Sequence, residues 1–114
     1  MIVRIDAGAP VVTAAANPST AVKGPKPVNV TISGIVTDAV SGISSATYNV
    51  IDEYGTTQPS GAITVQANGS YSFTLALPAN RPGNDRDGHL YTIVVSGVDQ
   101  AGNSTTASTT LRVN

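Results

Sequence analysis

Asn84, Asp85 and Asp87 have the residue types and spacing of an oxygen-ligand site for a metal ion. They belong to the run Asn-Asp-Arg-Asp-Gly, in which two carboxylates are one residue apart and a glycine ends the run. Calcium binds to loop oxygens of this kind. The run is not an EF-hand, because the later ligands and the closing glutamate are missing. The alternative is an Asx turn, in which such side chains accept hydrogen bonds from nearby backbone N–H groups.

Asp38, Asp99 and Asn103 form a second candidate calcium cluster. Asp38 and Asp99 each end a predicted strand, and Asn103 follows Asp99 by four residues. We expect the two strand ends to lie at the same pole of the domain. Asx-turn chemistry is again the alternative. Apart from calcium at these two clusters, no cofactor is predicted.

The sequence does not support a catalytic site. His89 is the only histidine, and no serine lies in a Gly-x-Ser-x-Gly turn, so a Ser-His-Asp triad lacks its nucleophile. We therefore predict that His89 is an exposed loop residue. Asp52 and Glu53 are adjacent, and adjacent strand residues point to opposite faces, so they cannot flank one glycosidic bond. The chain is predicted not to be an enzyme.

Composition limits the classes of protein further. The chain has 114 residues, 14 Thr, 11 Ser, no Cys and a formal net charge of -1. That length suits one domain with a single core. A near-neutral chain lacks the basic surface that nucleic-acid binding requires. No apolar run is long enough to span a membrane, so we expect no membrane insertion.

Period-two alternation of apolar and polar residues dominates the chain and indicates β-strands. In residues 70–77, for example, Tyr71, Phe73, Leu75 and Leu77 share one face. Alternation of this kind predicts seven strands, at residues 11–16, 28–37, 46–52, 62–66, 70–77, 90–98 and 107–113. Seven short strands over about 100 residues indicate an all-β fold, an antiparallel β-sandwich of immunoglobulin type.

Three local features refine this prediction. Asn68-Gly69 predicts a hairpin turn that pairs residues 62–66 with residues 70–77. Gly34, inside a predicted strand, indicates a bulge or a close approach by a neighbouring segment. Tyr91 is expected to place its ring in the core and to bond its hydroxyl to a nearby loop. Residues 1–9 are interpreted as a linker or extension, and residues 10–114 as the sandwich domain.

Several short strings in sequence order resemble bacterial immunoglobulin-like modules of surface and secreted proteins. The most specific is the string from Tyr91 to Asn103, which ends in Asp-Gln-Ala-Gly-Asn and matches the penultimate strand and last hairpin of such modules. Other matching strings include residues 28–38, 41–43 and 48–55. The resemblance covers about residues 10–113. It implies an accessory module of an exported multidomain protein, and the family has no catalytic residues to transfer.

The sequence therefore leads to two functional hypotheses. The first is a non-catalytic spacer or adhesive module of an exported prokaryotic protein, at the cell surface or outside the cell. The second is a ligand-binding or carbohydrate-binding accessory domain of a secreted hydrolase, stabilised by calcium. The expected partners are neighbouring domains of the same chain and a surface glycan or protein. We expect a monomer that binds no nucleic acid.

Overall fold

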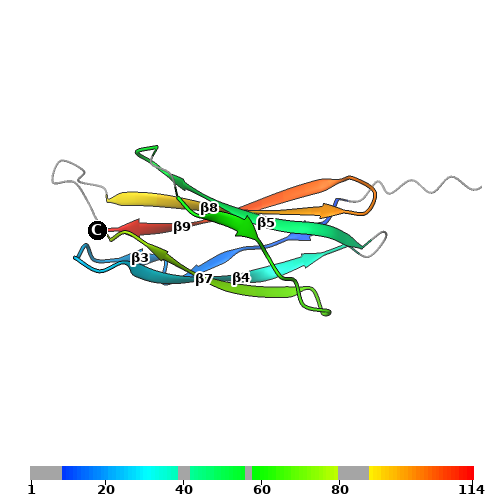
Figure 1. Cartoon of the computed structure of the whole chain (residues 1–114), viewed down its shortest axis with the longest axis horizontal. Coiled ribbons are helices and arrows are strands. Elements are labelled where there is room, and N and C mark those ends of the chain that lie inside the picture. Colours follow the sequence, from blue (N-terminus) through cyan, green and yellow to red (C-terminus); the bar gives the residue numbers. More distant parts are fainter. Residues whose placement is uncertain (1–8, 39–41, 56–57, 80–87) are drawn as a thin grey trace, which may run out of the picture.

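The fold is a sandwich of two β-sheets, seen in a computed structural model that describes residues 9–38, 42–55, 58–79 and 88–114. The strands of both sheets run along the longest axis of the molecule (Figure 1). The strands are β1 (Val11–Val12), β2 (Ala15–Asn17), β3 (Thr20–Ala21), β4 (Val28–Thr37), β5 (Ile43–Asp52), β6 (Ser60–Ala62), β7 (Ser70–Leu77), β8 (His89–Asp99) and β9 (Ser104–Val113). The described residues contain no helix of the length and apolarity that crossing a bilayer requires.

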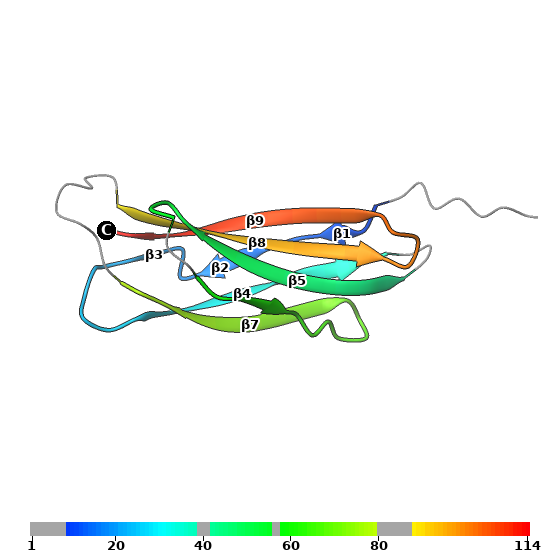
Figure 2. The same cartoon turned by 45° about the horizontal axis from the view of Figure 1, so that its top comes forward.

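One sheet is centred on β4. β1 and β2 pair antiparallel with one side of β4, and β7 pairs antiparallel with the other side. The second sheet has the order β3-β9-β8-β5-β6, with β3 parallel to β9 and the other pairs antiparallel. The first predicted strand, residues 11–16, is thus divided into β1 and β2 of one sheet, and β3, which was not predicted, belongs to the other sheet (Figure 2). The predicted all-β sandwich is confirmed.

The core lies between the sheets and follows the predicted alternation. In β8 every odd-numbered residue is buried, from His89 through Asp99. The predicted inward faces of β4 and β7 are buried or half-buried as well. Most of the core consists of β-branched and aliphatic side chains with two tyrosines, and its largest fully buried side chains include Tyr91, Ile32, Leu77, Ile93 and Leu111.

The hairpin predicted between residues 62–66 and 70–77 is wrong. The strand at this place is β6, which ends at Ala62 and pairs with β5 in the other sheet. Residues 63–69 then cross between the sheets, and the turn before β7 is closed by a bond from Gly69 N to Gln66 O. Gly69 has a φ of 89°, as the Asn-Gly signal predicted. Ile63 and Val65 still pack against the core, because a crossing segment can bury alternate side chains as a strand does.

Gly34 lies where another segment approaches β4 closely, as predicted. A Cβ atom at this position would collide with the backbone oxygen and carbonyl carbon of Thr13. Thr13 is the first of the two residues between β1 and β2, and its N donates to Ile35 O at 3.0 Å. Its carbonyl also accepts a hydrogen bond of 2.6 Å from the Tyr71 hydroxyl. The absence of a side chain at Gly34 therefore lets the first strand bend against β4.

Candidate functional site

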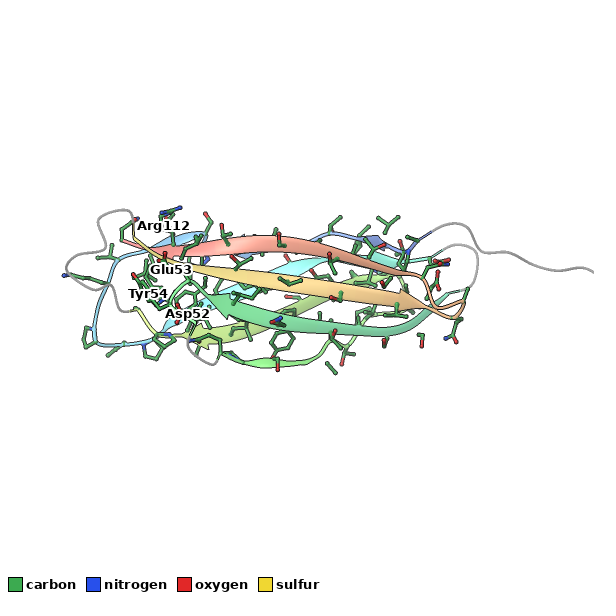
Figure 3. The ribbon with its side chains drawn as sticks, turned by 90° about the horizontal axis from the view of Figure 1, so that it is seen from above. Asp52, Glu53, Tyr54 and Arg112 are labelled. Carbon is green, nitrogen blue, oxygen red and sulfur yellow. The ribbon has the colours of Figure 1, made fainter. Side chains whose placement is uncertain are left out.

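The most developed polar cluster lies where β5 ends and β8 begins, at the pole that also holds the C-terminus (Figure 3). His89 Nε2 lies 2.6 Å from Asp52 Oδ1. His89 is 2% exposed and Asp52 is 5% exposed. Buried ionisable groups require hydrogen-bond partners, and each of these two residues supplies one for the other.

Further donors surround the Asp52 carboxylate. Tyr54 N donates to Oδ1 at 3.0 Å, and the Gln58 side-chain amide donates to Oδ2 at 3.3 Å. Among the described residues, the Asp52 carboxylate therefore has three hydrogen-bond partners, His89 from β8 and Tyr54 and Gln58 from the loop after β5. A carboxylate satisfied in this way holds the end of β5 against the start of β8.

Aromatic rings enclose the His89 imidazole. Its centroid lies 4.5 Å from that of Tyr54 and 4.4 Å from that of Tyr91. The Tyr91 hydroxyl donates to Pro78 O at 2.7 Å, which ties β8 to the segment after β7 in the other sheet. This is the role predicted for Tyr91. Burial, and then the negative charge of Asp52, raise the pKa of Tyr91 to about 12, so its hydroxyl stays protonated and able to donate.

Within the described residues, the contacts of the cluster are those of a structural site. His89 and Asp52 resemble the base and orienting pair of a triad, but a triad also needs a nucleophile within hydrogen-bond reach of the base. The ring neighbours of His89 are two tyrosines. The imidazole thus packs against both tyrosine rings. We interpret the cluster as a polar clamp, defined by Asp52, Tyr54, His89 and Tyr91.

The prediction that His89 is an exposed loop residue is wrong, since His89 is the first residue of β8 and is buried. Two signals could have corrected it. His89 lies two residues before the inward-facing Tyr91, and Asp52 lies two residues after the inward-facing Val50. Extending the alternation by one step in each strand places both side chains in the core. The register then brings the two strand ends together, because Asp52 pairs with Tyr91.

The predicted cluster of Asp38, Asp99 and Asn103 lies at the opposite pole. Asp99 Oδ1 accepts hydrogen bonds from Ala101 N at 2.9 Å and Asn103 N at 2.8 Å, and Oδ2 accepts one from the Asn103 amide at 3.1 Å. This is the Asx-turn arrangement that was the alternative to calcium. The described parts of the chain contain no group of three or more His, Cys, Asp or Glu side chains that could hold a metal. Asn84, Asp85 and Asp87 lie outside the described residues. Calcium binding stays a prediction.

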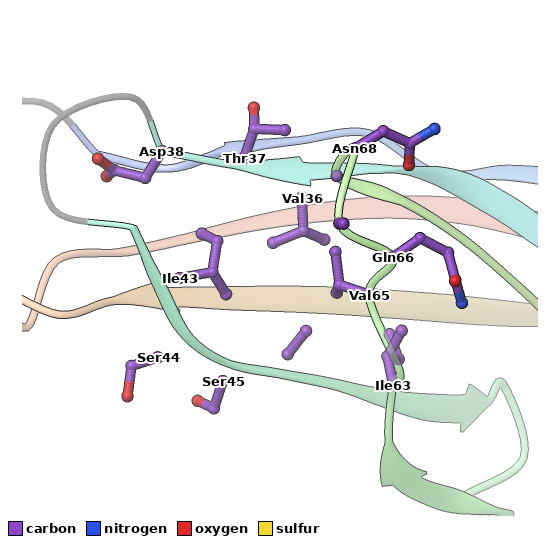
Figure 4. A pocket seen from close by; sticks show the side chains of 13 residues that line it. Val36, Thr37, Asp38, Ile43, Ser44, Ser45, Ile63, Val65, Gln66 and Asn68 are labelled. Carbon is purple, nitrogen blue, oxygen red and sulfur yellow. The ribbon is translucent and has the colours of Figure 1, made fainter.

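Asp38 borders a groove of about 470 Å³ at this pole (Figure 4). The groove lies between the end of β4, the start of β5 and the segment that crosses between the sheets. Its apolar residues are Val36, Ile43, Ala46, Ile63, Val65 and Ala67, and its polar residues include Thr37, Ser44, Ser45, Gln66 and Asn68. No aromatic residue lines it within the described residues.

The two sheets and their strand order define the chain as an immunoglobulin-like β-sandwich. The profile of the bacterial Ig-like domain family matches residues 1–113, and the chain belongs to this family. Such domains are structural or interaction modules, are generally non-catalytic and commonly occur in surface and exported proteins. No curated protein matches the chain at a significant level.

Proposed function

We propose that this domain is a spacer or adhesive module of an exported multidomain protein, at the cell surface or outside the cell, with neighbouring domains of the same chain as its first partners. The observation that carries the proposal is the path of the chain. The described residues begin at one pole of the sandwich and end at the other (Figures 1 and 2). A module of this shape adds length between whatever precedes it and whatever follows it.

Contacts along β8 give the scale of that separation. At one end, Pro10 and Val12 are neighbours of Gly97. At the other end, Val113 pairs with His89. Gly97 and His89 are eight residues apart in one strand, which corresponds to about 26 Å. Both strands that lead to the poles are fixed by ladder hydrogen bonds, so the separation is set by the fold.

A protein with two copies in tandem tests this proposal. The second copy begins with residue 1 directly after Asn114 of the first, and small-angle X-ray scattering gives the maximum dimension. We expect a dimension close to twice that of one copy, with the copies end to end. A control with a long Gly/Ser insertion between the copies should show a broader distribution of dimensions. A compact particle, with the copies side by side in the uninterrupted protein, would contradict the spacer proposal.

The groove at the Asp38 pole supports a second candidate, a carbohydrate-binding accessory domain of a secreted hydrolase. Its amide, hydroxyl and carboxylate groups can bond sugar hydroxyls, and its aliphatic residues can contact the C–H faces of a sugar ring. Without an aromatic platform we expect such binding to be weak. The test is a glycan array followed by NMR titration. Shifts confined to the groove, and lost in Gln66→Ala, would support this candidate, and no binding above background would reject it.

Calcium belongs to the second candidate as a stabilising ion. The proposed ligands are Asn84, Asp85 and Asp87. The supporting result is a melting temperature that rises in millimolar calcium, falls again with EDTA and no longer responds in Asp85→Asn/Asp87→Asn. A melting temperature that is the same in calcium and in EDTA would reject the ion.

A further inference from the structure

The free edge of β7 carries a set of hydrogen-bonding groups that is complementary to itself. β7 pairs with β4 along its whole length, from Ser70 to Leu77. No described strand pairs with its other edge. In Figure 2, β7 lies at the margin of its sheet. An unpaired edge is a template for another strand.

The register of β7 on β4 shows which groups face that edge. Val36 N donates to Gly69 O at 2.8 Å. Hydrogen-bonded pairs alternate in an antiparallel ladder, so the odd-numbered residues of β7 bond to β4. The N–H and C=O groups of Ser72, Thr74 and Ala76 therefore point to the free edge. All three of these residues are exposed.

Both ends of the free edge are defined. Ser70 O accepts a hydrogen bond from Gln66 N at 2.8 Å, so the edge is already occupied at the start of β7. Pro78, after the end of β7, has no N–H to donate. The available edge thus runs from Ser72 to Ala76, with three donors and three acceptors placed symmetrically about Thr74.

We propose that two copies of this domain associate through β7, antiparallel about a two-fold axis at Thr74. Thr74 then faces Thr74 of the second copy, and Ser72 faces its Ala76. Each of these pairs exchanges two hydrogen bonds, so every edge donor and acceptor of both copies is used. This complete match favours a second copy over an unrelated strand. The proposal departs from the monomer expected from the sequence, and it does not depend on the proposed spacer function.

The composition of β7 fits this pairing. Ser-Tyr-Ser-Phe-Thr-Leu-Ala-Leu contains no charge and no proline, and its pairing with β4 is regular. Edge strands that resist pairing usually carry charges, prolines or bulges. On the inner face, Phe73 would lie opposite Leu75 of the second copy. Phe73 is only half-buried in one copy, so pairing would cover apolar surface.

The charges beside β7 are complementary in the same arrangement. Exposed Lys23 and Lys26 lie near the end of β7, where Gly24 N donates to Ala79 O. Asp38 follows the end of β4, near the start of β7. An antiparallel two-fold axis places the basic end of one copy beside the acidic end of the other. The lysines of the two copies are thus kept away from each other, and so are the two Asp38 side chains.

Sedimentation equilibrium over a wide range of concentrations tests the association. We expect the apparent mass to rise from one copy towards two. Thr74→Pro should weaken dimerisation by at least about tenfold, because it removes a central edge donor while leaving the backbone bonds to β4 intact; the hydrogen bond between the Thr74 and Thr31 hydroxyls is lost as well. Thr74→Lys, which places two like charges face to face, should act in the same direction if the proline variant fails to fold. Thr92→Lys, on the outer face of the other sheet, is the matched control and should still dimerise.

Cysteine variants test the register, since the chain has no cysteine of its own. In the proposed dimer the two Thr74 Cα atoms are about 5.5 Å apart, within disulfide range. Under mild oxidation Thr74→Cys should therefore form a covalent dimer. Ser72→Cys alone should not, because its two copies would be more than about 13 Å apart, but it should cross-link to Ala76→Cys. A protein that is monomeric at all concentrations, a dimer that Thr74→Pro and Thr74→Lys both retain, or equal cross-linking of Thr74→Cys and Ser72→Cys would overturn the proposal.

Discussion

At the scale of single residues, the polar clamp replaces apolar packing at one end of the core. Asp52 and His89 occupy positions that the alternation of β5 and β8 reserves for buried side chains. A buried pair of this kind adds little stability over apolar residues of the same size, but removing one partner leaves the other buried without it. The two residues should therefore be strongly coupled.

A double-mutant cycle measures that coupling. We expect His89→Ala and Asp52→Ala each to lower the free energy of unfolding by about 2–4 kcal/mol. The double variant should cost clearly less than the sum, because neither partner is then left behind. Urea unfolding of the four proteins gives the values. Additive losses would show that the pair does not act as a unit, and Thr110→Ala, at an exposed position on the outer face of β9, indicates how large an unrelated loss is.

Asp99 allows a second prediction at this scale. Its carboxylate serves the turn before β9, so Asp99→Ala should lower stability by about 1–2 kcal/mol through loss of these hydrogen bonds. The loss should be equal in calcium and in EDTA, because the same oxygens are engaged by the turn. Thermal unfolding in the two buffers checks this. A loss that appears only in calcium would show that Asp99 is a ligand instead.

At the scale of elements, the strands with one apolar face and one polar face could be predicted from the sequence. The segment that crosses between the sheets could not. β4, β7 and β8 alternate over eight or more residues, and a shift of one residue would turn every apolar side chain to solvent. Residues 62–66 alternate too, but a period of two does not specify which sheet a segment joins. The hydrogen bond from Ile63 N to Ala46 O shows that this choice is made by β5, far away in the sequence. The polar clamp could not be predicted from the patterns of β5 and β8 alone for the same reason. The contact between Asp52 and His89 also depends on the register in which the two strands pair.

The first strand depends on one glycine in β4. Gly34→Ala should lower the free energy of unfolding by more than about 2 kcal/mol, because the new methyl group collides with backbone atoms of Thr13, which cannot rotate away. Gly24→Ala is the matched control, since nothing lies within 4 Å of a Cβ atom there. Hydrogen exchange should show protection lost at β1 and β2 in the first variant. An unchanged stability of Gly34→Ala would refute the close approach as a constraint.

At the scale of the whole molecule, described charges gather at the poles and the sheet faces are largely hydroxyl-bearing. The outward residues of β7 and β9 include Ser72, Thr74, Thr106 and Ser108, and all four are exposed. Threonine suits this position because its branched Cβ favours the strand while its hydroxyl remains hydrated. The high content of Ser and Thr is thus explained by the outward-facing positions of the alternating strands, which these residues occupy. A flank without charge also leaves the β7 edge open to a second copy.

The two buried tyrosines make global stability depend on pH in the alkaline range. Burial raises the pKa of Tyr71 to about 12, and burial together with Asp52 raises that of Tyr91 to about 12. In the unfolded chain both ionise near pH 10. Between these values the unfolded state binds fewer protons than the folded state, so the free energy of unfolding should fall as the pH rises from 10 to 12, and the contribution is fully present below pH 10.

Urea unfolding at a series of pH values from 8 to 12 measures this slope. The variant Tyr71→Phe/Tyr91→Phe should be less stable than the parent at pH 8, because it lacks the hydroxyl bonds to Thr13 O and Pro78 O. Its stability should then decline less steeply above pH 10, because neither position ionises on unfolding. The two curves are expected to approach each other towards pH 12. Parallel curves over the whole range would show that groups other than Tyr71 and Tyr91 cause the loss of stability at alkaline pH. The ionisation of these two hydroxyls would then not be coupled to unfolding.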